Sequence, residues 1–247
     1  MLETHISPAI QLRIPGDWSH PGQMLERIPD GYQLTPESLV TPSGAEISFT
    51  PVAPDDIFPQ IFRSACRRPA QPDELAILDR YTVNIVLCAP GGSLATALTM
   101  MQAAAAFVQA GGAGVFIDNS ALAHGGSDWQ AMTDDGGSDA ISFAYTSIIR
   151  GSRQAYTMGM QTMGFPDLVM PFSETNENER GDSLIEILRY ICAGDKPVGV
   201  GHVIADEQGP RFQIAAAPPD EHQDTNPMHN PYGRLKIVSV TDLAGLN

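Results

Sequence analysis

The sequence predicts an α+β fold: one domain with a mixed β-sheet built around a single β-α-β unit, and with helices largely on one face of that sheet. The first observation is the β-α-β pattern itself, which lies between Tyr81 and Ser120. The second is that Gly and Pro, at 23 and 20 of the 247 residues, are frequent enough to indicate many turns and short elements.

The N-terminal part of the chain predicts several short elements. Residues 8–16 have the pattern of a strand, and residues 21–27 that of a short helix. Residues 32–52 alternate apolar and turn-forming side chains, which predicts two or three short strands. Residues 57–68 repeat apolar side chains at helical spacing, and the Pro-containing stretch 69–74 has the composition of a linker.

The β-α-β unit is the strongest local pattern. Residues 81–90 form a continuous β-branched apolar run, the Gly-Gly-Ser turn 91–93 interrupts it, and residues 94–110 are good helix formers. Glycines end this helix, and residues 113–120 are a second apolar strand. The two strands should be parallel neighbours, or next but one, and joined by a right-handed crossover.

The C-terminal part predicts more strands and one helix. Residues 141–151 and 167–170 are predicted strands, residues 172–182 a polar loop, and residues 183–194 a helix with one apolar face. Short strands then flank a long loop at 218–233. One domain is predicted.

The predicted domain covers residues 8–247, with an N-terminal lobe at 8–68, a core at 80–217, and a C-terminal loop and strand at 218–240. The first residues lack the basic segment and apolar run of a signal peptide. The apolar stretch 94–108 is too short and too polar to span a bilayer. A soluble, cytoplasmic protein without membrane contact is therefore expected.

The formal net charge is −15, and it is unevenly distributed. No Lys or Arg occurs between Tyr81 and Ile149, although five aspartates do. Such a surface repels phosphate backbones, so nucleic-acid binding is not expected. A protein partner or a homodimer remains an open expectation, and no small-molecule ligand is identified.

Three cysteines, Cys66, Cys88 and Cys192, are too few and too widely spaced for a disulfide framework or a structural zinc site. Each lies in an apolar setting, so buried free thiols are expected.

The segment after the second apolar strand is the main candidate site. Open α/β sheets bind ligands at the carboxyl ends of their parallel strands. Asp118, at the carboxyl end of the second strand, should therefore lie near the 91–93 turn, which follows the first strand. Asp118 and His124 are candidate catalytic residues, since a carboxylate and an imidazole can exchange protons. No metal site is predicted, although these two are the residues that a divalent metal would use. The candidate ligand-binding residues are Gly91, Gly92, Ser93, Asn119, Ser120 and Asp128.

A purely structural interpretation competes with this one. Asx residues commonly end strands, and Gly-Ser is a common helix-capping sequence, so the same residues could only turn the chain. His202 and His229 are single histidines without metal-ligand spacing. The chain contains no phosphate-loop, nucleophile-elbow, HExxH or CxxC motif, and no cofactor is identified.

One segment resembles a known family. TMGMQTMGFPDLVM, residues 157–170, followed by the helix SLIEILRYICAG, is similar to the T-x-G-[LM]…G-[LF]-P-[DE]-L segment of an uncharacterised bacterial family, domain of unknown function 4261. The resemblance covers roughly residues 80–205 and leaves out the first 70 residues and the HNPYG tail. It implies an α+β domain in the bacterial cytoplasm and transfers no catalytic residue.

Two functions therefore stay open. The first is a non-catalytic ligand- or protein-binding module with an acidic surface. The alternative is an enzyme, such as a metal-assisted hydrolase, with its site near residues 91–93 and 118–128. The first is favoured, because enzymes that use a nucleophile or a metal usually carry a denser motif.

Overall fold

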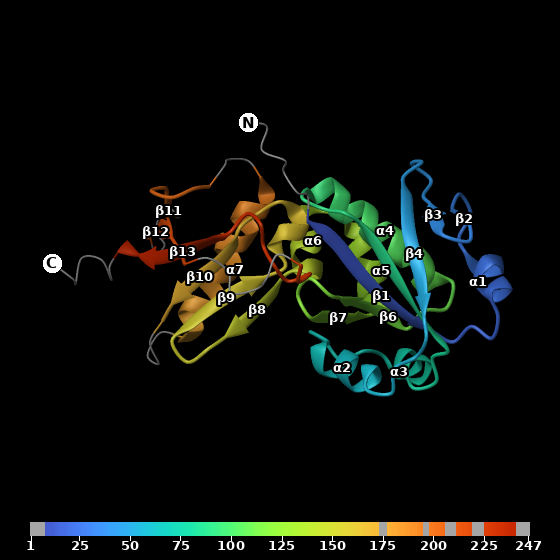
Figure 1. Cartoon of the computed structure of the whole chain (residues 1–247). Helices are drawn as coiled ribbons and strands as arrows, with labels where there is room; N and C mark the ends of the chain where they lie inside the picture. Colours follow the sequence, from blue (N-terminus) through green and yellow to red (C-terminus); the bar gives the residue numbers. More distant parts are fainter. Residues whose placement is uncertain (1–7, 173–176, 195–197, 206–210, 219–224, 241–247) are drawn as a thin grey trace.

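The computed structural model describes residues 8–172, 177–194, 198–205, 211–218 and 225–240, which form an α+β fold with two sheets (Figure 1). Across the first sheet the strands are β2 (Gln33–Leu34), β3 (Ser38–Val40), β4 (Glu46–Val52), β5 (Val83–Pro90), β1 (Ala9–Gly16), β6 (Gly114–Ile117) and β7 (Leu122–Gly125). Across the second they are β11 (Val203–Ala205), β12 (Arg211–Ala216), β13 (Arg234–Ser239), β10 (Asp167–Pro171), β9 (Gln154–Met158) and β8 (Ser147–Arg150). The α+β class is confirmed, but the expected single mixed sheet is divided into two.

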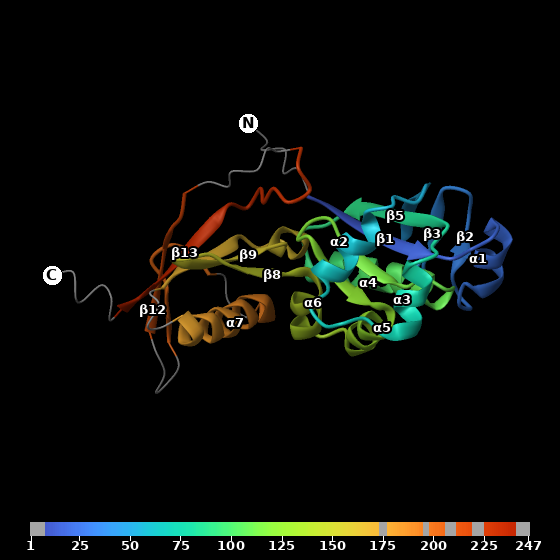
Figure 2. The same cartoon turned by 90° about the horizontal axis from the view of Figure 1, so that it is seen from below.

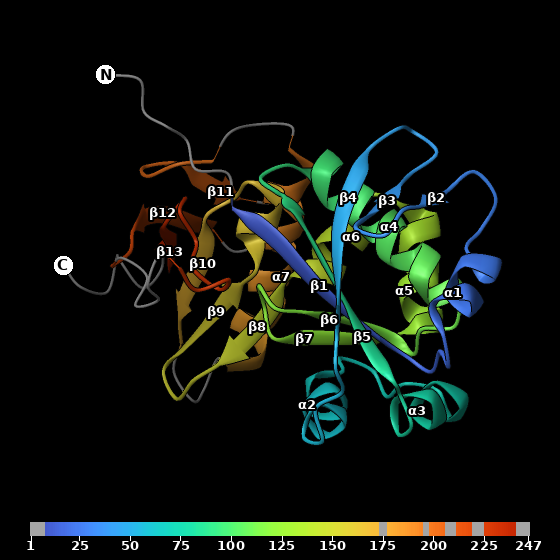
Figure 3. The ribbon, with the colours of Figure 1, turned by 45° about the vertical axis from the view of Figure 1, so that its right-hand side comes forward.

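The β-α-β unit is confirmed in its next-but-one form. β1 lies between β5 and β6 and is antiparallel to both, so β5 and β6 run parallel to each other (Figure 3). Leu12 of β1 pairs with Leu87 on one side and with Ile117 on the other. All three are fully buried, which explains why these strands are apolar along their length.

Helix α4 (Leu94–Gln109) connects the two parallel strands. Ser93 caps it, because its Oγ accepts a 3.1 Å hydrogen bond from the amide of Thr96, and Thr96 Oγ1 accepts one of 3.2 Å from the amide of Ser93. The alanines of its second half, Ala103–Ala106, are buried on every side of the helix, which packs against both the sheet and α5.

Helices cover both faces of the first sheet, rather than largely one. Alternating residues of β6 point to opposite sides: Val115 and Ile117 pack in the main core, and Phe116 packs in a second cluster. On the main side lie α4, α5 (Gly126–Asp135) and α6 (Ser138–Tyr145), while α2 (Phe58–Ala65) and α3 (Pro72–Leu78) supply the second cluster. Figure 1 shows α2 and α3 on the far side of β6 and β7 from α4.

The second sheet has its own helix, α7 (Glu177–Ala193), which packs against β10. Figure 2 shows α7 lying along this sheet, with α6 at one end of the helix. The buried Leu184, Ile187, Leu188 and Ile191 form its inner face. The predicted helix at 183–194 is therefore present, and it begins earlier, within the stretch predicted as a polar loop.

Two other expectations need correction. Residues 141–151 are the end of α6 followed by β8, rather than one strand. Ile141, Ala144 and Tyr145 are buried at helical spacing, although alternate apolar residues in the same stretch also fit a strand. The expected linker at 69–74 contains the start of α3, where Gln71 and Glu74 form a capping box.

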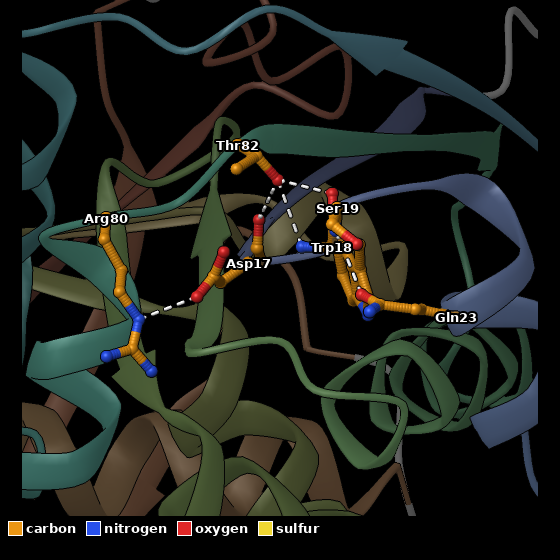
Figure 4. A network of polar contacts seen from close by, with 7 residues as sticks. Asp17, Trp18, Ser19, Gln23, Arg80 and Thr82 are labelled. Carbon is orange, nitrogen blue, oxygen red and sulfur yellow. Dashed lines mark hydrogen bonds and ion pairs between the residues drawn. The ribbon is translucent and has the colours of Figure 1, made fainter.

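A polar network fixes the connection between β1 and α1 (Pro21–Arg27) (Figure 4). Thr82 Oγ1 accepts a 3.0 Å hydrogen bond from the amide of Trp18 and donates one of 2.7 Å to the carbonyl of the same residue. Arg80 pairs with Asp17 at 2.7 Å. The Trp18 indole donates to the carbonyl of Ala110, so this connection is held against the end of α4.

Among the helices in the described residues, none has the length and apolar character that crossing a bilayer requires. All three cysteines are free. Cys192 is buried as expected, Cys66 is half-buried, and Cys88 is exposed.

Candidate functional site

The 91–93 turn and the Asp118–Ser120 segment lie at the same edge of the first sheet, as their parallel strands predict. The amide of Gly91 donates a 2.7 Å hydrogen bond to the carbonyl of Pro8, and the side-chain amide of Asn119 donates one of 2.9 Å to the carbonyl of Ala9. Both segments are therefore held by the beginning of β1. A ligand can bind between these segments only if their packing leaves a cavity.

Residues from the second half of the protein pack against the 91–93 turn. The amide of Gly92 donates a 2.9 Å hydrogen bond to the carbonyl of Thr162. A Cβ on Gly164 would lie 2.4 Å from the carbonyl oxygen of Gly92, so the two backbones are in close contact. Ser93 is the cap of α4. These residues join the two sheets, and they line none of the three cavities described below.

Asn119 is also part of this junction. It is fully buried; its Oδ1 accepts a 2.9 Å hydrogen bond from the amide of Gln11, and its Nδ2 also donates to the carbonyl of Pro227 at 2.9 Å. The neighbouring Ser120 is buried too, and its Oγ has no hydrogen-bond partner among the described protein atoms. Asn119 therefore ties the loop before β13 to the first sheet.

Asp118 and His124 are not brought together. His124 pairs with Val115 in the β6–β7 ladder and shares its face, which is the face of α4 and α5. Asp118 lies three positions after Val115, on the opposite face, where it binds Nε of Arg13 through both carboxylate oxygens at 2.8 and 2.9 Å. Its side chain is 11% exposed.

His124 has the environment of a structural histidine. It is 1% exposed, its Nε2 lies 3.0 Å from the carbonyl oxygen of Ala144, and its ring packs near those of Trp129 and Phe143. Burial lowers its pKa to about 4, so the imidazole is neutral at pH 7. Asp128 lies in the first turn of α5, and its carboxylate is 3.8 Å from Arg68. Within the described ranges, no three metal-ligating side chains come together.

A cavity of about 370 Å³ lies elsewhere, between α6, β8 and α7. Figure 2 shows these three elements side by side, where the two halves of the protein meet. The walls combine apolar and cationic side chains, which is unusual in a chain with twice as many acidic as basic residues. The lining residues used below are Arg67, Arg150, Arg189, Asp139, Phe143, Thr146, Ile148, Gly181, Ile185 and Leu188.

Arg67 is the least exposed of the three arginines that line this cavity. Its Nη1 donates a 2.9 Å hydrogen bond to the carbonyl of Phe143, its Nη2 donates to the carbonyl of Thr146, and its guanidinium lies 4.3 Å from the centre of the Phe143 ring. Burial, together with the neighbouring Arg68, lowers its pKa to about 10. In the part of the chain that the structure describes, no carboxylate forms an ion pair with Arg67.

Thr146 adds an unused polar group to the same wall. The residue is 2% exposed, and its Oγ1 has no hydrogen-bond partner among the described protein atoms. Leaving a buried hydroxyl unpaired costs roughly 1–3 kcal/mol.

The other charged residues of the cavity differ in whether an opposite charge neutralises them. Arg189 is paired with Glu186 at 2.9 Å, and Asp139 adds a negative charge. Arg150 is exposed at the end of β8, and among the described side chains no carboxylate pairs with it. The cations of the cavity without a carboxylate partner among the described residues are therefore Arg67 and Arg150, and Asp139 offsets part of their charge.

Two further cavities, of about 460 and 410 Å³, offer less to a ligand. Amide, hydroxyl and small apolar side chains dominate the first, together with Asp134. The second contains Arg80, whose charge Asp17 neutralises, and Arg27, and Ile77 is the one large apolar side chain among its lining residues.

Sequence reasoning missed the Arg67 cavity entirely. Arg67 and Thr146 are 79 positions apart and belong to no motif. The one usable signal was the long stretch without basic residues, from Tyr81 to Ile149, which ends at Arg150. Because basic residues are so scarce there, the arginines on either side of this stretch were candidates for an anion-binding site.

Residues 156–237 match the model of a family described as "Domain of unknown function (DUF4261)". The match confirms the resemblance and changes its limits. Residues 80–155 lie outside it, whereas the HNPYG tail, which had been left out, lies inside. No curated protein and no solved structure matches the chain.

Proposed function

We propose from the geometry that the protein is a non-catalytic binding module for a small organic anion; the description of the family that residues 156–237 match names no activity. The ligand occupies the cavity between α6, β8 and α7, with its acidic group beside Arg67. The free cysteines suit a reducing compartment, so we place this role in the bacterial cytoplasm.

One observation carries the proposal. Arg67 is a half-buried guanidinium without a carboxylate partner among the described residues, and it lies in the same wall as the unpaired hydroxyl of Thr146. Charges that are partly removed from water are favoured when an opposite charge lies beside them, and in the described part of the chain the Arg67 guanidinium has only two carbonyl oxygens and the Phe143 ring as partners. An anionic ligand would supply both missing interactions. The apolar walls then favour an organic anion over an inorganic one.

Catalysis has less support. Asp118 and His124 lie on opposite faces of a sheet, and each already has a partner, Arg13 and the carbonyl of Ala144 respectively. The proton-exchanging pair on which the enzyme alternative depended is therefore not assembled. A ligand-binding role needs no such pair.

The test is titration calorimetry and thermal melting with octanoate, an anion with an apolar body. At about 100 times its Kd, octanoate should stabilise the protein by about 2.7 kcal/mol. Thr146→Val should weaken octanoate binding about tenfold, since one hydrogen bond to a charged group is lost. The same change should not destabilise the empty protein, because Val has nearly the same volume and Oγ1 has no protein partner.

Matched controls separate binding from general effects. Thr50→Val, on the exposed side of β4, and Arg63→Gln, on α2, should leave octanoate binding unchanged, whereas Arg67→Gln should abolish it. Absence of octanoate binding to the wild-type protein, or equal binding by the wild type and the Thr146 and Arg67 variants, would show the proposal to be wrong.

A further inference from the structure

The cavity has a second cation at its other end, and this inference about its ligand rests on the proposed function. Thr146, whose carbonyl binds Arg67, directly precedes β8, and Arg150 ends that strand. Four residues of extended chain span about 13 Å, so the two cationic positions lie at opposite ends of the cavity wall.

Residues of α7 line the opposite wall over a similar distance. A Cβ on Gly181 would lie 2.9 Å from Nη2 of Arg150, so the start of α7 is against the end of β8. Seven residues later, Leu188 lines the same cavity. At 1.5 Å per residue, this part of the helix is about 10 Å long.

Apolar side chains make up part of the walls between the two cations, beside the polar Asp139 and Ser142. Ile148 of β8 and Ile185 of α7 both line the cavity between its ends, and Phe143 lies at the Arg67 end. Neither Arg67 nor Arg150 has a carboxylate partner in the described ranges, whereas Arg189 is neutralised by Glu186. The cavity therefore has two cations without a carboxylate partner among the described residues, and apolar side chains line part of the space between them.

We infer that the ligand is an elongated, two-headed anion, of the class of linear α,ω-dicarboxylates. One carboxylate binds Arg67 and the hydroxyl of Thr146. The hydrocarbon chain lies between Ile148 and Ile185. The second carboxylate reaches Arg150, which lies in the more exposed part of the cavity and can bind it without being fully desolvated. Gly181 leaves the space that the Arg150 side chain occupies.

Titration calorimetry with probes of one or two acidic heads and of different lengths tests this inference. Suberate, with eight carbons and two carboxylates, should bind about tenfold more tightly than octanoate, which has the same length and one carboxylate. Succinate, with four carbons, is too short to reach both arginines and should bind no better than octanoate.

Arg150→Gln should remove the advantage of suberate and leave octanoate binding within about twofold of wild type. Arg153→Gln is the matched control, because it removes one exposed charge three positions away, on a residue that does not line the cavity. It should leave both affinities unchanged, apart from a small uniform loss that added salt suppresses.

The outcomes separate the two proposals. Equal affinities for suberate and octanoate, or an Arg150→Gln variant that still prefers suberate, would overturn the two-headed ligand while leaving anion binding at Arg67 in place. Binding of succinate as tightly as suberate would overturn the length argument. Failure of every probe to bind would overturn the proposed function as well.

Discussion

The side-chain amide of Asn230 donates a 2.8 Å hydrogen bond to Oδ2 of Asp167, and it also donates at 3.0 Å to the carbonyl of Phe165. Thr157 Oγ1 donates to the other carboxylate oxygen of Asp167 at 3.1 Å. These bonds connect β9, β10 and the turn before β13. Asp167 is 2% exposed, and burial raises its pKa to about 7 in spite of the hydrogen bonds.

Asp167 should make the protein less stable as pH rises. Its pKa is higher in the folded state than in the unfolded state, so the folded state holds this proton more tightly. The contribution to stability is complete below pH about 4, falls as pH rises to about 7, and then stays constant, with a total change on the order of 4 kcal/mol. Urea unfolding from pH 4 to 8 should show this component in the wild type and not in Asp167→Asn.

The matched control is Asp30→Asn, which removes an exposed carboxyl group. Its unfolding free energy should follow the wild-type dependence on pH. If the difference between wild type and Asp167→Asn stayed the same at every pH, burial of the Asp167 charge would not be the cause.

His124, in contrast to Asp167, should make the protein less stable as pH falls. Its pKa is lower in the folded state, about 4, than in the unfolded state, so the unfolded state binds the proton first as pH falls. The contribution is complete above pH about 6.5 and decreases towards pH 4, by on the order of 3 kcal/mol. The stability gap between wild type and His124→Gln should therefore narrow over this range, whereas the gap for His20→Gln, an exposed histidine, should not.

Asp118→Asn should lower stability and leave ligand binding intact. The change leaves Arg13 without its carboxylate partner in a partly buried position, at a cost of about 1–2 kcal/mol. Octanoate affinity should not change, because Asp118 does not line the cavity. A changed affinity for octanoate or for a divalent metal, at unchanged melting temperature, would return the site to the end of β6.

Gly164→Ala tests the junction between the two sheets. Its Cβ would lie 2.4 Å from the carbonyl oxygen of Gly92, and its φ of 88° is unfavourable for any other residue. We expect a loss of about 3 kcal/mol or more by chemical unfolding, because the backbones must separate. Gly44→Ala has a similar φ of 84° but no atom within 4 Å of the new Cβ, so it should cost only about 1 kcal/mol.

Nucleic acid should not bind. The net charge of −15 and the absence of basic residues between Tyr81 and Ile149 leave no cationic surface of the size that a phosphate backbone requires. Gel-shift titrations at physiological salt should show at most weak binding that further salt removes. A nanomolar, salt-resistant complex with DNA or RNA would contradict this expectation.

The sequence was informative wherever the determining interactions are local. The β-α-β unit could be predicted because its strands are apolar throughout, and Ser93 caps the helix between them. The position of β1 between β5 and β6 could not, because pairing between distant strands leaves no local pattern. Helix α6 was misread because its apolar residues fit two periods at once.

The separation of Asp118 from His124 could not be predicted for a related reason. Asp118 and His124 are close in sequence, but His124 pairs with Val115 across the β6–β7 hairpin, and Asp118 lies three positions after Val115, on the opposite face of the sheet. Knowing the register of the β6–β7 hairpin would have been enough to separate them. Arg67 reaches Thr146 only because the chain after α2 runs beside β7. There, the backbones of Cys66 and Ala123 form an isolated β-bridge. No rule based on spacing predicts that approach.

The position of β1 also determines how this protein must fold. Leu12 pairs with Leu87, 75 positions later, and with Ile117, 105 positions later, so the centre of the first sheet consists of contacts that close long loops. Such contacts lower the folding rate, because the loss of chain entropy precedes the gain from pairing. During synthesis, β1 must wait, unpaired and apolar, for about 100 further residues, and at 5–20 residues per second that delay lasts roughly 5–20 s. A chaperone that shields β1 in that interval should therefore raise the yield of folded protein without touching its final stability.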